Sequence, residues 1–320
     1  MTVAEYLYLW LDRQRLRLQP RTWDAYRQTV ACYIVPGLGS KQLESITPME
    51  LEQLYIDLLD HGGRNGRSLS VPTIRYISAV LHKALADAVR TGLVTHNVAD
   101  RAALPRLDPR ATEQSASDIR VWTAAQARHF LELTAGDHHG DLWATALGTG
   151  MRRGELFGLR WSDVTSDRQL RVATSLTIVD GRPRLKVPKT NRVRHLHLDV
   201  RTAAVIDRRH ASQDDQRRRA SARWRNELDL VFTDEDGEPL IPQRTTHRFR
   251  RLVRRLDVPT IRLHDLRHTH ATLLLQAGVP IKVISERLGH STIAMTMDVY
   301  AHVLPAMDRD AADRFGDLLA

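Results

Sequence analysis

The chain has 320 residues, of which 27% are charged and 42% hydrophobic, a balance typical of a globular protein and not of a disordered one. This length suggests about two domains. No apolar stretch of about 18 residues occurs, which excludes a transmembrane helix, and residues 1–18 do not have the pattern of a secretory signal. The single cysteine, Cys32, excludes internal disulfides and cysteine-based zinc sites and fits a reducing compartment.

Positive charge is concentrated in arginine. Lysine and arginine number 47 against 38 acidic residues, which gives a net charge of +9, and only five of the 47 are lysines. Arginines cluster in segments 208–225 and 244–255. Such clusters are typical of a protein that binds a polyanion, nucleic acid above all. The alternative is a soluble basic protein encoded by GC-rich DNA.

Residues 1–100 predict a small all-helical domain. Apolar residues recur at helical spacing within 3–11 and again within 23–34. Pro36, followed by glycine, is expected to end the second of these helices.

Two further helices complete this predicted domain. Thr47 is followed by a proline and by Glu50, the pattern of a helix N-cap with a capping box, and the helix is expected to end near Gly62. Ser70 is expected to cap a fourth helix, which ends before Gly92.

Residues 101–120 predict an interdomain linker, within a stretch that changes character from about residue 95. Pro105, Pro109 and the polar run 113–118 leave this segment without a periodic apolar face. The domain boundary is therefore expected here.

Residues 121–320 predict a second domain, mainly helical. Thr123 with Gln126 has the capping-box pattern at the start of its first helix. Helices are expected at 124–135, 141–148, 153–158, 200–222, 244–256, 264–277, 280–288 and 292–302, with one more after residue 305.

A small antiparallel sheet interrupts these helices. Apolar residues alternate over 170–178, Asp180 with the following glycine predicts a hairpin turn, and a second turn at 188–191 leads into a strand at 193–198. Lys189 is expected at or near the second turn.

The densest polar segment is HDLRHTH at 264–270. On a helix, His264 and Arg267 lie on one face, where the guanidinium can bind two phosphate oxygens and the imidazole can move a proton. A metal site on His264 and His268 is disfavoured because the cationic Arg267 lies beside them. The alternative is a solvated basic helix face, which we favour for His268 and His270.

A second polar segment, 148–156, places glycines around a helix start, where backbone N–H groups favour anions. Arg152 follows the turn and Glu155 comes three residues later. Taken alone, this segment is better explained as a tight helix–helix turn with an Arg–Glu pair.

A third segment surrounds Gly289, which can end one helix and leave His290 in the break before the next. Tyr300 follows ten residues later and is the only tyrosine after residue 76. A lone tyrosine is more often an ordinary amphipathic aromatic side chain.

Taken together and in this order, the segments resemble the tyrosine recombinase (phage integrase) family. The resemblance rests on TGMRRGE at 149–155, a lysine at a hairpin turn, HDLRH at 264–268, LGH at 288–290 and the late Tyr300. It covers the whole chain and implies a multidomain protein of α and α+β class. Residues 1–100 resemble the family's core-binding domain, a SAM-like helical bundle, and residues 121–320 resemble its catalytic domain, with the fold of DNA breaking-rejoining enzymes.

Six positions of the family's catalytic set match residues of this chain: Arg152, Lys189, His264, Arg267, His290 and Tyr300. Lys186 lies near Lys189 and leaves that assignment open, although the turn favours Lys189. Glu155 matches an acid that supports the segment of the first arginine. His290 stands where the family has His or Trp and is expected to donate a hydrogen bond to the phosphate.

The resemblance implies that Tyr300 attacks a DNA phosphate and forms a 3′-phosphotyrosyl link, which conserves the bond energy. Arg152 and Arg267 would bind the non-bridging oxygens. Lys189 would protonate the leaving 5′-oxygen, and His264 would act as base or proton shuttle. No ATP, metal or other cofactor is then needed.

The implied partners are double-stranded DNA recombination sites, a homotetramer assembled on paired sites and an accessory directionality factor, with no membrane. The implied location is the bacterial cytoplasm. Integration or excision of a prophage or other mobile element is the expected task. The chain begins at the core-binding helix, so an arm-binding domain is expected to be absent or truncated.

Two alternatives remain at this stage. A type IB topoisomerase-like enzyme would share the nucleophile but relax supercoils. A catalytically silent DNA-binding regulator would bind DNA without cutting it.

Overall fold

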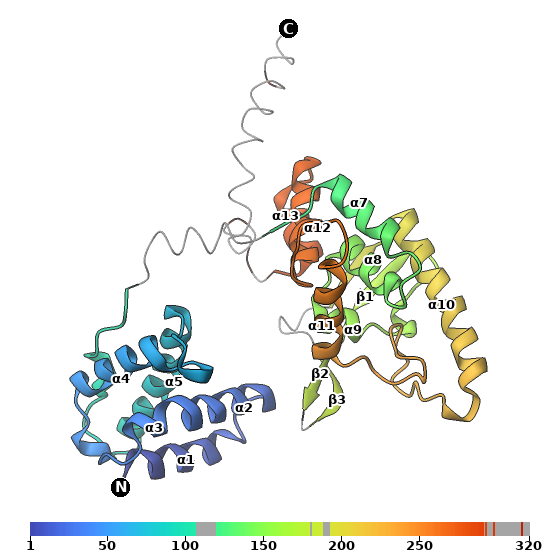
Figure 1. Cartoon of the computed structure of the whole chain (residues 1–320). Coiled ribbons are helices and arrows are strands. Elements are labelled where there is room, and N and C mark those ends of the chain that lie inside the picture. Colours follow the sequence, from blue (N-terminus) through green and yellow to red (C-terminus); the bar gives the residue numbers. More distant parts are fainter. Residues whose placement is uncertain are drawn as a thin grey trace. The chain divides into compact units, whose positions relative to one another are not determined.

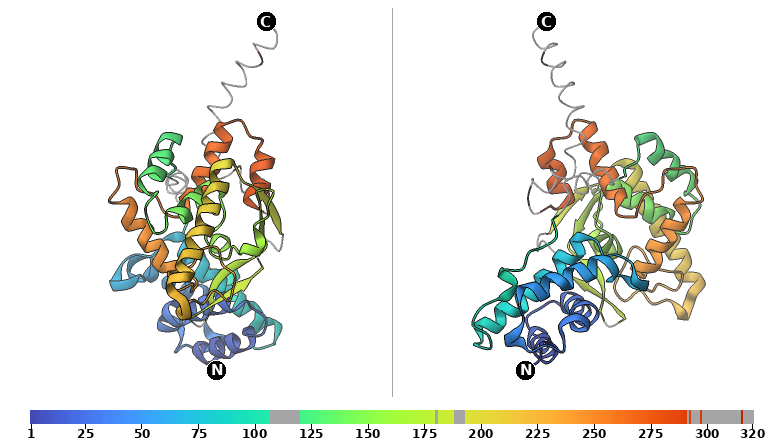
Figure 2. Two further views of the ribbon diagram at one scale, coloured as in Figure 1. Left: turned by 90° about the vertical axis from the view of Figure 1, so that its right-hand side faces the viewer. Right: turned by 60° about the vertical axis from the view of Figure 1, so that its left-hand side comes forward.

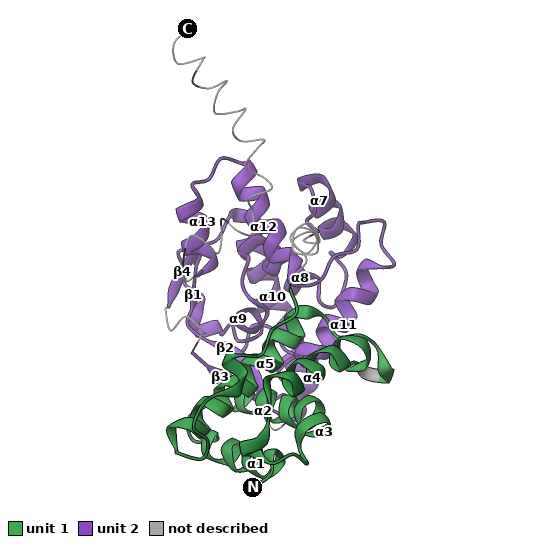
Figure 3. Cartoon of the chain, turned by 90° about the vertical axis from the view of Figure 1, so that its left-hand side faces the viewer, with its two compact units in different colours: residues 1–114 green, residues 115–320 purple. Residues whose placement is uncertain are grey.

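The computed structural model describes residues 1–106, 120–179, 181–187 and 193–290, together with Thr292, Met297 and Phe315 (Figure 1). The chain divides into two compact units, residues 1–114 and 115–320 (Figure 3). Each unit has a hydrophobic core of its own. In the described ranges, no helix is long and apolar enough to cross a membrane.

The first unit is all-helical, as the sequence predicts. Its helices are α1 (Val3–Gln14), α2 (Pro20–Thr29), α3 (Val35–Leu38), α4 (Pro48–His61) and α5 (Val71–Arg90). The predicted capping box at Thr47 is confirmed, because its side chain accepts from the Glu50 N–H while the Glu50 carboxylate accepts from the Thr47 N–H. Thr2 and Glu5 form a second capping box at the start of α1.

The prediction that Pro36 ends the second helix is wrong. A π turn over Val30–Ile34, closed by a hydrogen bond from the Val35 N–H to the Val30 carbonyl, carries the chain from α2 into α3. Pro36 lies in the first turn of α3, where its missing N–H breaks no helical hydrogen bond. A proline therefore continues the helical path here.

The fourth helix starts where the sequence predicts, but Ser70 does not cap it with its side chain. Ser70 is the N-cap residue of α5, yet its hydroxyl lies 2.9 Å from the Thr73 hydroxyl and caps no backbone N–H. Beyond α5, Val98 is buried against the core of the first unit, so the chain still packs there at the start of the stretch that changes character in the sequence. Most of the predicted linker, residues 107–119, lies outside the described residues.

The second unit contains most of the helices. They are α7 (Ala124–Leu133), α8 (Gly140–Thr149), α9 (Arg153–Phe157), α10 (Val200–Ala220), α11 (Pro242–Val253), α12 (Asp265–Gln276) and α13 (Ile281–Leu288). The Thr123–Gln126 capping box at the start of α7 is confirmed. Helix α8 packs against both α10 and α12 and lies between them in Figure 1; Figure 2 gives two further views of the chain.

The single predicted sheet is replaced by two small antiparallel pairs. Strand β1 (Gln169–Val172) pairs with β4 (Arg194–His197), and β2 (Ser175–Val179) pairs with β3 (Arg182–Lys186). The alternating run breaks between β1 and β2, where the Thr174 hydroxyl donates to the Gly158 carbonyl just after α9. The predicted turn residues Asp180 and 188–191 lie outside the described residues.

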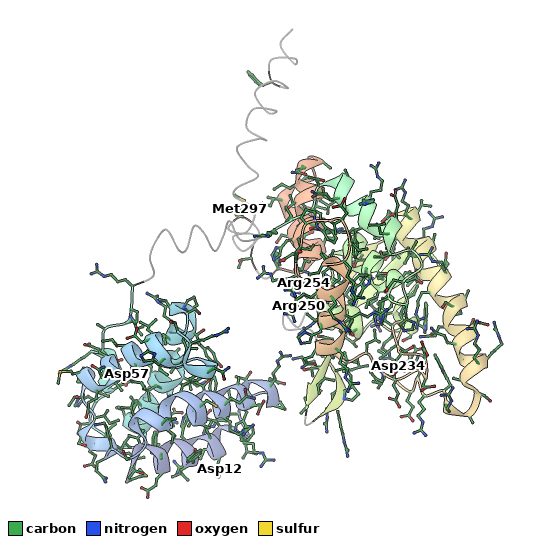
Figure 4. The ribbon with its side chains drawn as sticks, viewed as in Figure 1. Asp12, Asp57, Asp234, Arg250, Arg254 and Met297 are labelled. Carbon is green, nitrogen blue, oxygen red and sulfur yellow. The ribbon has the colours of Figure 1, made fainter. Side chains whose placement is uncertain are left out.

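The C-terminal helices predicted at 292–302 and after residue 305 fall outside the described residues, apart from three single positions. Exposed charged side chains cover both units (Figure 4). They include Asp12 and Asp57 on the first unit and Asp234, Arg250 and Arg254 on the second.

Candidate active site

The turn between α8 and α9 places the first arginine. Gly150 ends α8 in a left-handed conformation, with φ 62°, and a Cβ there would lie 2.7 Å from Cδ2 of His270. Glycine is therefore required by both conformation and space. Arg152 is the N-cap residue of α9, and its backbone N–H donates to the Glu155 carboxylate at 2.9 Å.

Glu155 is buried and lies between two guanidinium groups. Its Oε1 accepts from Nη1 of Arg152 at 2.9 Å and from Nη1 of Arg194 at 3.1 Å, and its Oε2 accepts from Nη2 of Arg194 at 2.7 Å. Burial alone would raise the pKa of the Glu155 carboxyl, but the hydrogen bonds and charge of Arg194, followed by Arg152, lower it to about 2. The group is a carboxylate at any pH at which the protein would work.

The second arginine comes from α12. Arg267 is 4% exposed and donates from Nη1 to the Gly150 carbonyl at 2.7 Å and from Nη2 to the Leu288 carbonyl at 2.8 Å. It is thus tied both to the turn that carries Arg152 and to the end of α13. Segments far apart in the sequence meet at this point.

The C-terminal end of α13 collects three arginines on three consecutive carbonyl groups. Arg194 Nε donates to the Arg287 carbonyl at 2.9 Å, Arg267 to that of Leu288, and Arg152 Nη2 to that of Gly289 at 2.6 Å. The last carbonyls of a helix lack intrahelical partners and carry the negative end of its dipole, which favours cations. Gly289 ends the helix in a left-handed conformation, with φ 67°, as the sequence predicts.

His290 follows this end directly. Burial, and then the positive charges of Arg267 and Arg152, lower the pKa of its imidazole to about 4. The ring is therefore neutral near pH 7 and carries one N–H donor. This state suits hydrogen bonding to an anion without proton exchange.

His264 is the N-cap residue of α12 and is exposed. Its ring lies 5.1 Å from the ring of His268, in an edge-to-face arrangement. Partial desolvation by the surrounding chain, then the charges of His268 and Arg267, lower the pKa of the His264 imidazole. The imidazole of His264 is thus neutral near pH 7.

The structure shows two side chains, His270 and Arg194, whose importance the sequence did not reveal. His270 is not on a solvated face, as predicted, but is 8% exposed, with its Nδ1 2.8 Å from the Leu147 carbonyl. Its Nε2 accepts from Nε of Arg287 at 3.1 Å, which makes Nδ1 the protonated nitrogen. His268 is half-buried. The sequence did carry a signal that His270 is buried. It lies four residues after the apolar Leu266, so both side chains lie on the same face of the helix.

Arg194 is the other omission. It alternates with Leu196 and Leu198 along a strand, so it lies on the buried face, where an arginine needs an acidic partner. That partner is Glu155.

Two of the six predicted catalytic residues, Lys189 and Tyr300, lie outside the described residues. Lys186, the alternative lysine, is the last residue of β3. In the described ranges, no group of three or more His, Cys, Asp or Glu side chains is placed to hold a metal ion.

Comparison with known families agrees with this architecture. Residues 134–307 match the model of the phage integrase family, and residues 2–59 match that of the phage integrase N-terminal SAM-like domain. The first match alone covers more than half of the chain.

Relatives and solved structures extend over nearly the whole chain. It is 26% identical to a XerC-like tyrosine recombinase of Caldanaerobacter subterraneus, over 99% of this chain and 83% of the relative. It is 26% identical to the ICEBs1 integrase of Bacillus subtilis, over 94% and 79%. The fold is that of the Tn1549 transposon integrase in complex with a circular intermediate DNA, with a TM-score of 0.78 at 24% identity, over 97% and 99%.

Lambda integrase, as a dimer bound to a core site, has a TM-score of 0.67 at 18% identity, over 92% of this chain and 97% of that one. The two-unit architecture, the arginine cluster and both family matches lead to the same assignment. The chain belongs to the phage integrase family of tyrosine recombinases and is a site-specific DNA recombinase.

Proposed function

We propose that the second unit cuts and rejoins DNA with Tyr300 as nucleophile and with Arg152 and Arg267 as the groups that bind the reacting phosphate. The observation that supports this most directly is the convergence of the two guanidiniums on the adjacent carbonyls of Leu288 and Gly289, beside His290. Two arginines fixed side by side form a preorganised site for a tetrahedral anion.

The proposed reaction proceeds in two balanced steps. The Tyr300 oxygen attacks the phosphorus, a phosphotyrosyl bond forms at the DNA 3′ end, and the bond from phosphorus to the 5′-oxygen breaks. Lys189 gives a proton to that oxygen, and His264 takes the proton of the tyrosine. A 5′-hydroxyl of the partner strand then reverses the sequence, so that no bond energy is lost.

The arginines act mainly in the transition state. Charge builds on the non-bridging oxygens as the tyrosine attacks, and donors that are already fixed need no reorganisation to stabilise it. Arg152 has two hydrogen bonds to other residues, through Nη1 and Nη2, and we assign its remaining donors to the phosphate. Neutral His290 adds one further donor.

We further propose that the enzyme integrates or excises a prophage or other mobile element in the bacterial cytoplasm. The relatives that support this include the ICEBs1 integrase and the integrase of Mycobacterium phage D29. The first unit, which matches the SAM-like domain, is proposed to bind the DNA core site together with the catalytic unit, across a linker at 101–120. A homotetramer on paired sites is proposed by analogy with lambda integrase, which forms a tetramer bound to a Holliday junction. We also propose an accessory directionality factor as a partner.

The alternatives considered from the sequence are not favoured. Neither topoisomerases nor silent regulators are among the relatives described above, which are recombinases and integrases. A requirement for two paired sites would separate recombination from relaxation of supercoils.

The test uses nicked suicide duplexes made from the junctions of the mobile element that carries the gene. The wild-type chain should form a covalent adduct that maps to Tyr300 by peptide mass, and Tyr300→Phe should bind the same duplex without forming it. An adduct that persists in Tyr300→Phe would contradict the assignment of the nucleophile.

A further inference from the structure

Arg194 has no role in the reaction described so far, yet it binds both Glu155 on α9 and the end of α13. Its two terminal nitrogens bind the two oxygens of Glu155, at 3.1 and 2.7 Å, in the parallel arrangement that only a guanidinium can make. Its Nε binds the Arg287 carbonyl at 2.9 Å. The side chain is only 10% exposed, so it is a structural part of the site floor.

The contacts of Arg194 determine which hydrogen-bond acceptors remain for the Arg152 guanidinium. Glu155 would otherwise have one guanidinium partner and could draw both ends of Arg152 toward itself. With Arg194 in place, Arg152 donates a single side-chain hydrogen bond to Glu155, and its Nη2 reaches the Gly289 carbonyl. Arg194 therefore keeps the guanidinium of Arg152 turned toward the end of α13.

The same side chain fixes the helix end that carries His290. The Arg287 carbonyl is the first of the three consecutive acceptors, and Gly289 packs directly on the guanidinium of Arg194. A Cβ on Gly289 would lie 2.9 Å from Nη1 of Arg194. Since the next residue is His290, any shift of Arg194 would move this histidine relative to Arg152 and Arg267.

We propose that Arg194 is a positioning residue for strand cleavage, acting through Glu155 on Arg152 and through the Arg287 and Gly289 backbone on His290. This inference rests on the proposed function of Arg152. Arg194 also lies on the strand that follows the segment of Lys189 in the sequence, so one side chain connects β4, α9 and the end of α13. A positional error of about 1 Å in such a site can lower the rate by about 10²-fold.

The chain offers a matched control. Arg171 on β1 is also a strand arginine bound to a buried acid, since its Nη2 lies 2.8 Å from Oδ1 of Asp163, which is 1% exposed. Its neighbour in register is His195, the residue after Arg194. In the described ranges, the hydrogen bond and ion pair of the Arg171 side chain go to Asp163 and not to Glu155 or α13. Replacing it removes an arginine from a buried acid outside the site, although the Arg171 side chain is more exposed, at 47%, than that of Arg194.

The experiment measures adduct formation in a single turnover at saturating suicide duplex, and duplex affinity separately. Arg194→Ala should lower the rate by about 10²-fold with affinity changed less than about 3-fold, because positioning affects the transition state. Arg194→Lys keeps the charge but not the two parallel bonds and should recover only part of the rate. Arg171→Ala should stay within about 3-fold of wild type in both.

Amide hydrogen exchange of the full chain gives a readout that does not depend on catalysis. Arg194→Ala should increase exchange in 152–156 and 287–290 and leave α7 as in wild type, whereas Arg171→Ala should leave both segments protected. Unchanged exchange in both segments, or an equal rate loss in Arg171→Ala, would overturn the proposal. A wild-type chain without an adduct would contradict the proposed function instead, and the exchange data would still decide the role of Arg194.

Discussion

The two units differ in the kind of polar side chain that they bury. In the described ranges, the first unit buries only uncharged ones, Gln14, Thr29, Ser78 and Asn97. The second buries six acidic or basic side chains: Glu155, Asp163, Arg209, Asp265, Arg267 and His270. Burying a charge is unfavourable unless it is paired and hydrogen-bonded.

The first unit is therefore stabilised mainly by packing, whereas the second also holds charged side chains in fixed positions. In the first unit, apolar faces on α1, α4 and α5 explain the fold with little else. In the second, the ends of α8 and α13 are held by Arg152, Arg194 and Arg267, so the same contacts that stabilise the unit also build the site. Perturbing charges should therefore affect the two units unequally.

The largest effect is expected for Glu155→Gln. Removing the carboxylate leaves two arginines beside each other without their counter-charge, which should lower the free energy of unfolding by about 3–5 kcal/mol. The counterpart in the first unit is Asp87→Asn, which removes an acid bound by Trp10 and Arg90 at a partly exposed position and should cost about 1 kcal/mol. Urea denaturation followed by circular dichroism measures both. Equal losses would contradict the distinction between the units.

Arg267→Ala should reveal the catalytic side of the same contacts. We expect the rate of DNA cleavage to fall by about 10²–10³-fold, equivalent to about 2.7–4 kcal/mol of transition-state stabilisation. Arg90→Ala, an exposed arginine of the first unit, should leave the rate unchanged at saturating DNA. Gel shifts and single-turnover cleavage separate binding from chemistry. A loss of affinity as large as the loss of rate would argue against a transition-state role.

Two glycines with the same backbone conformation sharpen the comparison further. Gly150 and Gly92 have φ of 62° and 73°, but a Cβ would collide with His270 at the first and meet nothing within 4 Å at the second. Gly150→Ala should therefore cost about 2–4 kcal/mol, from backbone strain and overpacking together. Gly92→Ala should cost about 1–2 kcal/mol, from the backbone alone. Thermal unfolding of the two variants tests this. A similar loss of stability in both would show that the side chains around Gly150 can shift to make room for a Cβ.

The last effect is spread over a range of pH. Burial, then the positive charge of Arg287, lower the pKa of His270 to about 4, whereas an unfolded histidine has its usual pKa of about 6.5. Between these values the unfolded chain binds a proton that the folded chain does not, so stability should fall with decreasing pH from about 6.5 to about 4. The slope from this one group is at most about 1.4 kcal/mol per pH unit. His270→Gln should flatten the urea-derived profile in this window; an unchanged profile would exclude His270 as a contributor.

Sequence patterns predicted local features better than distant contacts. The capping boxes at Thr47 and Thr123 depend on residues three apart, so they could be predicted with their partners. The π turn before Pro36 could not, because it depends on how α2 and α3 pack against the rest of the unit. Likewise, the division into two strand pairs occurs where Thr174 contacts Gly158, a residue 16 positions earlier in the chain.

The site shows the same limit. Motif order identified Arg152, Arg267 and His290, which the structure brings together at the end of α13. Arg194 and His270 were missed, since their importance comes from Glu155 and Arg287, partners that are distant or on another element. The roles of all six catalytic residues stay predictions, to be tested by the variants above.

The three consecutive carbonyl groups at the end of α13, which accept from Arg194, Arg267 and Arg152, affect which substitutions the protein should tolerate. The three acceptors are main-chain oxygens, so no change of side chain at 288 can remove them, provided that the helix end keeps its course. Residue 289 is restricted to glycine, because its left-handed backbone and the guanidinium against it leave little room for a side chain. Residue 287 is restricted for another reason, since the Arg287 side chain binds His270 and the Gly148 carbonyl. A saturation library across 287–289 should therefore tolerate replacement of Leu288 by apolar residues of similar volume. At position 289 it should tolerate almost nothing but glycine.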